Sequence, residues 1–74
     1  MVALSEIQKK IAAAIRGSGK TQTAIASELG ITQATVAHYV KGDKMPALDT
    51  LANLCEALDL DANDILCIHE YSVK

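Results

Sequence analysis

Two short segments of helical pattern, joined by a tight glycine turn, constrain this sequence more than any other feature. The segments span residues 21–29 and 32–41. Thr21 and Thr32 stand at their starts, where a hydroxyl oxygen can accept a hydrogen bond from the first N–H groups of a helix. Gly30 lies between them and can adopt the positive φ that ends a helix abruptly. The pattern therefore predicts two helices that meet at a sharp turn.

Small and apolar side chains fall where two such helices must pack. Ala26 is small at the expected crossing point, and Gln22 and Gln33 begin the two helices. The expected core positions are Ile25, Leu29, Ile31 and Val36. Two helices joined in this way form a helix-turn-helix, which lays its second helix in the major groove of DNA. Residues 21–42 therefore indicate a DNA-binding motif, with residues 33–41 as its recognition helix.

Two further apolar stripes predict one helix on each side of the motif. The first is expected over residues 6–16, with Ser5 and Gln8 at capping-box spacing, and the other over residues 48–58. The expected buried positions of the first are Ile7, Ile11, Ala12, Ala14 and Ile15. Those of the second are Leu48, Leu51, Ala52, Cys55 and Leu58.

The rest of the sequence completes an all-α fold. Asp61 or Asn63 could cap a short fifth helix. No segment shows the period-two alternation of a strand. A chain of 74 residues forms one small domain at most, and its stability is marginal unless its helices pack well or it dimerises. We expect a single compact five-helix domain over residues 1–74.

The composition argues against membrane and secreted proteins. The chain has no apolar run of about 18 residues, as a transmembrane helix would need. Its N-terminus lacks the basic-then-apolar layout of a secretory signal. Without an export signal, Cys55 and Cys67 are expected to be reduced thiols. We therefore expect a cytoplasmic protein.

The charge is distributed unevenly along the chain. The net charge of −2 is unusual for a DNA-binding protein. However, residues 1–46 contain six Lys and Arg against three acidic residues, whereas residues 47–74 contain one Lys against six. This distribution favours a basic face toward phosphate and an acidic face pointing away from it. Non-specific affinity for DNA should be low, so binding should depend on dimerisation and base contacts.

Two loose motifs have more ordinary explanations. Residues 14–21 match a relaxed P-loop pattern with Ala14 in place of the first Gly, but a P-loop follows a strand of a larger sheet domain. Cys55, Cys67 and His69 lack the paired ligand spacings of a structural zinc site. No set of nucleophile, base and orienting residue is evident. We expect no enzyme activity, metal, cofactor or small-molecule substrate.

An ordered set of residues between positions 21 and 66 carries a family resemblance. It comprises Thr21, Gln22, Ile25, Ala26, Leu29, Gly30, Ile31, Thr32, Val36, Gly42, Pro46, Ala47, Leu48, Asp49, Thr50, Leu51, Ala57, Leu58 and Leu60. In this set the chain resembles the lambda-repressor-like helix-turn-helix domains, also called the Cro/CI or XRE family. Members are mostly bacterial and phage transcription regulators that bind operator DNA as dimers. The resemblance implies the same fold and double-stranded DNA as the partner.

The resemblance also implies which side chains contact DNA. Gln33, Ala34 and His38 would face the groove floor, within about 140° of one helix face at about 100° per residue. A Gln can bind adenine N6 and N7, the Ala34 methyl can pack on a thymine methyl, and His38 can donate to guanine or to phosphate. The implied contacts to the DNA backbone are Thr21, Gln22, Thr32, Thr35, Lys41 and Lys44.

Two positions depart from the family pattern. Many members pair an Arg late in the first helix with a Glu late in the recognition helix, and the matching residues here are Ile15 and Val40. Both positions are apolar, so the sequence predicts a packing contact between them in place of an ion pair. Such an exchange is often neutral or stabilising.

The C-terminal segment holds more apolar side chains than one side of a short helix can bury, including Tyr71 and Val73. They could close the monomer core. Alternatively, Ile65, Leu66 and Ile68 could form a two-fold dimer interface. We expect a homodimer, because two-fold pairing would place the recognition helices one DNA turn apart, about 34–36 Å.

These observations predict a sequence-specific DNA-binding regulator that represses transcription by occupying an operator. The alternative is a protein-interaction module of the antitoxin or antirepressor type, which the acidic second half of the chain favours. Replacement of Gln33 would weaken DNA binding in the first case only. In the second case, changes at Ile65, Leu66 or Ile68 would abolish partner binding.

Overall fold

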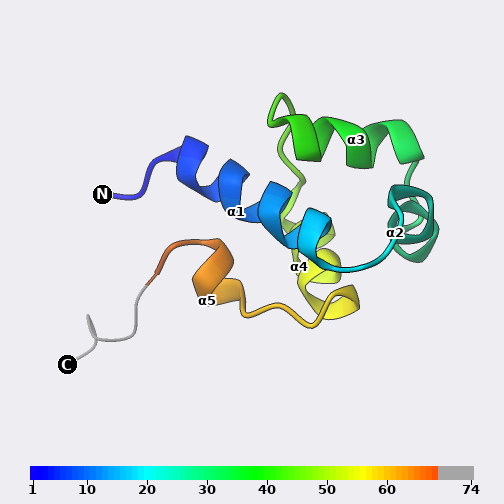
Figure 1. Ribbon diagram of the computed structural model, residues 1–74. Coiled ribbons are helices and arrows are strands. Elements are labelled where there is room, and N and C mark those ends of the chain that lie inside the picture. The colour runs from blue at the N-terminus through cyan, green and yellow to red at the C-terminus, as the bar shows by residue number, and fades with distance from the viewer. Residues whose placement is uncertain (69–74) are drawn as a thin grey trace.

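The computed structural model describes residues 1–68, and within that range it contains five helices and no strand (Figure 1). The helices are α1 (Leu4–Gly17), α2 (Gln22–Leu29), α3 (Gln33–Lys41), α4 (Leu48–Ala57) and α5 (Ala62–Ile65). The predicted all-α fold of five helices is therefore confirmed. None of these helices is long and apolar enough to cross a lipid bilayer.

Helices α2 and α3 begin and end where the sequence predicts. Thr21 Oγ1 accepts a hydrogen bond of 3.0 Å from a backbone N–H in the first turn of α2. Thr32 Oγ1 accepts one of 3.2 Å from the Thr35 N–H at the start of α3. Gly30 and Gly42 end the two helices with φ of 69° and 84°, a left-handed conformation that glycine adopts without a Cβ penalty.

The start of α1 differs from the prediction. The helix begins at Leu4, and its N-cap is Ala3, whose carbonyl accepts the Glu6 N–H at 3.0 Å and whose side chain cannot cap the helix. Ser5 therefore lies inside the first turn, not ahead of it. The predicted capping box of Ser5 and Gln8 is wrong, and α1 has no side-chain cap.

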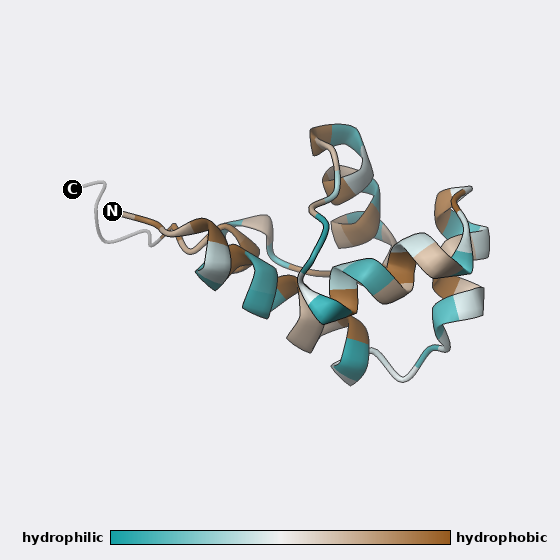
Figure 2. Cartoon of the chain, turned by 90° about the horizontal axis from the view of Figure 1, so that it is seen from above, coloured by the Kyte–Doolittle hydropathy of each residue, from teal (hydrophilic) through white to brown (hydrophobic). Residues whose placement is uncertain are grey.

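One apolar core connects all five helices. Its buried members are Ile11, Ala12, Ile15, Ile25, Ala26, Val36, Tyr39, Leu51, Leu54, Cys55 and Ile65. No charged side chain among residues 1–68 is buried. In Figure 2 each helix carries both hydrophilic and hydrophobic residues along its length, as expected of helices that bury one side.

The predicted core positions of the first three helices are largely confirmed. Ile25 and Val36 are fully buried, while Leu29 and Ile31 are partly buried against the core. Tyr39 is an additional core residue that the sequence analysis did not identify, and only 5% of it is exposed. Burial and, secondarily, the Asp49 carboxylate raise the pKa of its hydroxyl.

The predicted stripe of α4 is partly wrong. Leu51 and Cys55 are buried as expected, but Leu54 is fully buried whereas Ala52 is exposed. Leu48 is 85% exposed. The buried stripe is thus rotated toward Leu54, which leaves Leu48 about 70° from its centre at about 100° per residue.

Helix α3 is held by two neighbours. It packs against α1 and against α2, while α2 also contacts α4 and α1 also contacts α5. Figure 1 shows α3 at the edge of the molecule, with the rest of the fold to one side of it. Val40 packs against the core that contains Ile15. A direct contact between these two side chains stays a prediction.

Candidate nucleic-acid interface

The exposed side of α3 carries the three residues predicted to contact bases. Gln33, Ala34 and His38 are all exposed, while Val36 and Tyr39 on the same helix are buried. The structure therefore brings the three predicted residues together on one solvent-facing surface. A helix presented at the edge of a domain in this way can enter a major groove, which is about 12 Å wide.

A hydrogen bond connects the N-terminal ends of α2 and α3. Gln33 Nε2 donates to Gln22 Oε1 at 2.8 Å. Gln33 keeps its carbonyl oxygen and a second amide hydrogen, the pair needed to bind adenine N6 and N7. Gln22 keeps its own amide N–H groups, which lie at the first turn of α2, where the helix dipole favours an anion.

Three threonine hydroxyls lie at the starts of these helices. Thr21 and Thr32 accept backbone hydrogen bonds as caps, and Thr32 Oγ1 lies 2.8 Å from Thr35 Oγ1. Whichever of the latter two hydroxyls donates, the other keeps its own hydrogen. Capping therefore leaves each helix start with an O–H group that can donate to a phosphate.

Lys41 and Lys44 lie at and after the C-terminal end of α3. Both are exposed, and neither takes part in an ion pair within residues 1–68. A cleft of about 320 Å³ between α1 and the end of α3 is lined by Lys9, Arg16 and Lys41, among others. Lys9 and Arg16 were not predicted to lie on this surface. Their spacing of seven residues, which puts both on one side of a helix, was the available signal.

Lys20, in the turn between α1 and α2, forms an ion pair within the protein. Its Nζ lies 2.8 Å from Glu28 Oε2 and 3.4 Å from the carbonyl oxygen of Ala57. It thereby connects the turn after α1 to α2 and to the end of α4. Its carboxylate partner, Glu28, lies in the last turn of α2.

His38 has a partner that the sequence analysis did not identify. Its Nδ1 lies 2.8 Å from Asp43 Oδ1, in the turn after α3. The two residues are five positions apart, farther than the neighbouring positions of one continuous helix. The left-handed Gly42 between them turns the chain back, so this pair could not be foreseen from helical spacing alone.

The residues predicted for a dimer interface are not equivalent. Ile65 is 3% exposed and belongs to the monomer core, so its assignment to a dimer interface is wrong. Leu66 is partly buried against the same core, whereas Ile68 is 51% exposed. The neighbouring Tyr71 and Val73 lie outside the described residues.

Comparison with known proteins agrees with this geometry. The helix-turn-helix family HTH_3, of the XRE and Cro/CI type, matches residues 9–65. The chain belongs to the helix-turn-helix family. Its matched region covers α2 and α3 with the helices that hold them, and the family is a DNA-binding one. No curated protein and no solved structure gives a significant match.

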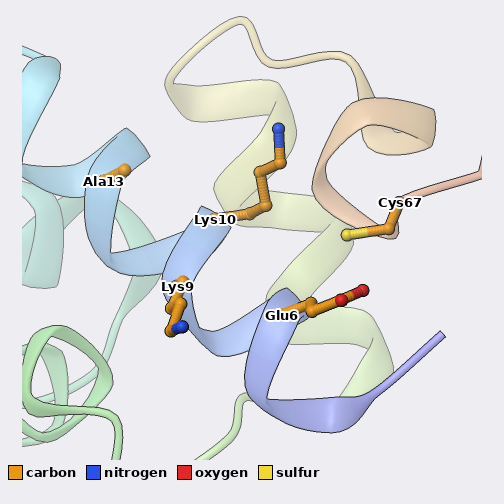
Figure 3. Close-up of a pocket in the computed structure, with 5 residues that line it drawn as sticks. All are labelled: Glu6, Lys9, Lys10, Ala13 and Cys67. Carbon is orange, nitrogen blue, oxygen red and sulfur yellow. The ribbon is translucent and has the colours of Figure 1, made fainter.

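A second cleft lies on another part of this helix-turn-helix domain, between α1 and the end of α5 (Figure 3). It measures about 410 Å³ and is lined by Glu6, Lys9, Lys10, Ala13 and Cys67. Lys10 Nζ pairs with Asp64 at 3.2 Å. Cys67 and the buried Cys55 are free thiols. Across residues 1–68, no three His, Cys, Asp or Glu side chains gather as a metal site would require, and His69 lies outside this range.

Proposed function

We propose that this domain is a sequence-specific transcriptional regulator that represses by occupying operator DNA. The observation that carries the proposal is the hydrogen bond that holds Gln33 to Gln22 at the exposed start of α3. It orients an amide toward the groove while leaving both adenine-binding groups unused. Orientation before binding reduces the entropy lost when the side chain meets a base.

The groups around Gln33 supply contacts to the DNA backbone. Free hydroxyl hydrogens at the starts of α2 and α3 and the ammonium groups of Lys41 and Lys44 would bind phosphates on either side of the groove. Ala34 would pack on a thymine methyl, so we expect a preference for A·T pairs near the N-terminal end of α3. These contacts position the domain, while Gln33, Ala34 and His38 provide the base recognition.

Binding as a homodimer follows from the small number of contacts that one α3 offers. Two copies related by a two-fold axis would recognise a palindrome with half-sites about one DNA turn apart. We propose that the exposed Ile68, with the partly buried Leu66, contributes to the dimer contact. Sedimentation at high micromolar concentration tests this: a monomer there would contradict the dimer.

The deciding experiment is selection of bound duplexes from a random DNA library at moderate salt, followed by sequencing. We expect an enriched palindrome. With that site, Gln33→Ala should weaken binding by about 1–3 kcal/mol, the value of one bidentate base contact. Asn53→Ala removes an exposed amide from α4 and serves as the control. No enrichment, or equal binding by Gln33→Ala and the control, would contradict the proposal.

A protein-interaction role of the antitoxin or antirepressor type is the second candidate. The observation that favours it is the charge: six acidic residues and one Lys lie between positions 47 and 74, and the net charge is −2. In that case the DNA library yields no enriched site. Replacement of Ile68 would then abolish capture of a protein partner, while Gln33→Ala would leave it unchanged.

A further inference from the structure

The turn that follows α3 binds His38 twice. The Asp43 backbone N–H donates to the His38 carbonyl at 3.3 Å, and the Asp43 carboxylate lies 2.8 Å from His38 Nδ1. The first bond belongs to the left-handed cap at Gly42, in which the residue after the glycine bonds back to the last turn. The cap therefore delivers the carboxylate to the imidazole, independently of any DNA.

The chemistry of this contact fixes the position of a proton. An ionised carboxylate can only accept hydrogen bonds, so the Nδ1 atom that faces Asp43 must carry the hydrogen. In a neutral imidazole only one nitrogen is protonated, so Nε2 then holds a lone pair. The nitrogen of His38 that Asp43 does not contact is thus an acceptor whenever the ring is uncharged.

We propose that Asp43 is a specificity-determining positioning residue, which makes His38 Nε2 a hydrogen-bond acceptor and so directs it to base edges that donate. In the major groove these donors are the N6 amino group of adenine and the N4 amino group of cytosine. Guanine offers only acceptors there, N7 and O6, so a neutral His38 held in this way disfavours it. The inference rests on the proposed function, because it assumes that α3 contacts bases.

The surroundings of the pair suit this role. The side chains of His38 and Asp43 are 47% and 55% exposed, so the pair lies at the surface of the domain, where a base edge could approach the imidazole. Water weakens the contact in the free protein, whereas exclusion of water in a groove would strengthen it. Asp43 itself need not contact a base, and its carboxylate would be repelled by a DNA phosphate. Its function is therefore to orient His38.

The first test needs no DNA. The nitrogen chemical shifts of His38 at pH 8.5, where an imidazole is uncharged, report which ring nitrogen carries the hydrogen. We expect hydrogen on Nδ1 in the wild type, and on Nε2 in a substantial fraction of Asp43→Ala. Glu56→Ala, which removes an exposed carboxylate from α4, should match the wild type. Hydrogen on Nε2 in the wild type would overturn the inference.

The second test measures base preference at the same pH. Duplexes of the selected site, varied at each base pair, are competed for wild type, Asp43→Ala, Asp43→Asn and His38→Ala. We expect one position where the wild type prefers adenine or cytosine over guanine about five- to tenfold, as expected of one net hydrogen bond. His38→Ala should abolish this preference. Asp43→Asn, whose amide can donate to Nδ1, should shift it toward guanine.

The outcomes separate the two proposals. If a site is selected but Asp43→Ala and Asp43→Asn keep the wild-type preference, the inference is overturned and the proposed function stands. If no site is selected, the proposed function fails and this inference fails with it. Loss of preference in Asp43→Ala together with the ring-nitrogen change supports both.

Discussion

Helices α2 and α3 differ from α1 and α4 in how their ends are determined. The first two have a threonine cap at the start and a left-handed glycine at the end. The other two begin at Ala3 and Ala47, which have no side-chain cap. Since α2 and α3 have only eight and nine residues, they would be marginal without such caps. The ends of α2 and α3 are thus determined by local residues, whereas α1 and α4 depend more on burial.

The largest effect should come from removing a side chain that orients α4 by burial. Leu54 is fully buried, so Leu54→Ala should lower the free energy of unfolding by about 2–5 kcal/mol, through lost burial and the cavity left behind. Urea denaturation followed by circular dichroism measures the change. Leu48→Ala is the control: this leucine is 85% exposed and should change stability by only about 0.5 kcal/mol or less.

Replacing a glycine that ends a helix should lower the free energy of unfolding by less than replacing a core side chain. At Gly30 an added Cβ meets no atom within 4 Å, but φ is 69°, so Gly30→Ala should destabilise by about 1–2 kcal/mol through backbone strain alone. Gly17→Ala is the matched control, since this glycine lies in α1 with the same open space and no positive φ. It should stabilise by about 0.5–1 kcal/mol. If both variants changed the free energy of unfolding in the same direction, backbone strain at Gly30 would not be the cause.

Adding the missing side-chain cap at the start of α4 should increase the stability of the protein. Ala47 has the extended backbone of an N-cap, φ −64° and ψ 164°, so Ala47→Ser should supply an acceptor and gain about 0.5–1 kcal/mol. Thermal unfolding of Ala47→Ser beside Ala52→Ser, an exposed position inside α4, measures it. The interior serine should be slightly destabilising. A gain at both positions would mean that capping is not the cause.

The smallest effect concerns the thiol that α4 buries. Burial and, secondarily, the Asp61 carboxylate raise the pKa of Cys55 above its ordinary value of 9.0. The stabilising contribution of the neutral thiol is therefore complete below about pH 9 and is lost as pH rises through the folded-state value. Urea denaturation at pH 8 and pH 10 measures this effect. Between these pH values the free energy of unfolding should decrease less for Cys55→Ala than for the wild type. Cys67→Ala should behave as the wild type.

The same contrast explains how much could be predicted from the sequence. Caps and turn glycines act within a few residues, so both ends of α2 and α3 were predictable from Thr21, Gly30, Thr32 and Gly42. The buried side of α4 was not, because Ala52 and Leu54 both fit an apolar stripe. Packing of α4 into the common core selects Leu54 over Ala52.

Residues of the candidate interface also differ in how far they could be predicted from the sequence. The exposed face of α3 followed from helical periodicity and from the family resemblance. The side-chain partners of His38 and Lys20, which are Asp43 and Glu28, did not follow from any local rule. Ile65 was ambiguous by pattern, and its burial in the monomer decides against a dimer contact.

The hydrogen bond between Gln22 and Gln33 restricts how this domain can diverge. A replacement at position 33 that lacks an amide donor also removes the partner of Gln22, so one substitution alters two helices at once. Replacements at the two positions would therefore be tolerated together more readily than singly. Related sequences that carry no amide at position 33 should differ at position 22 as well.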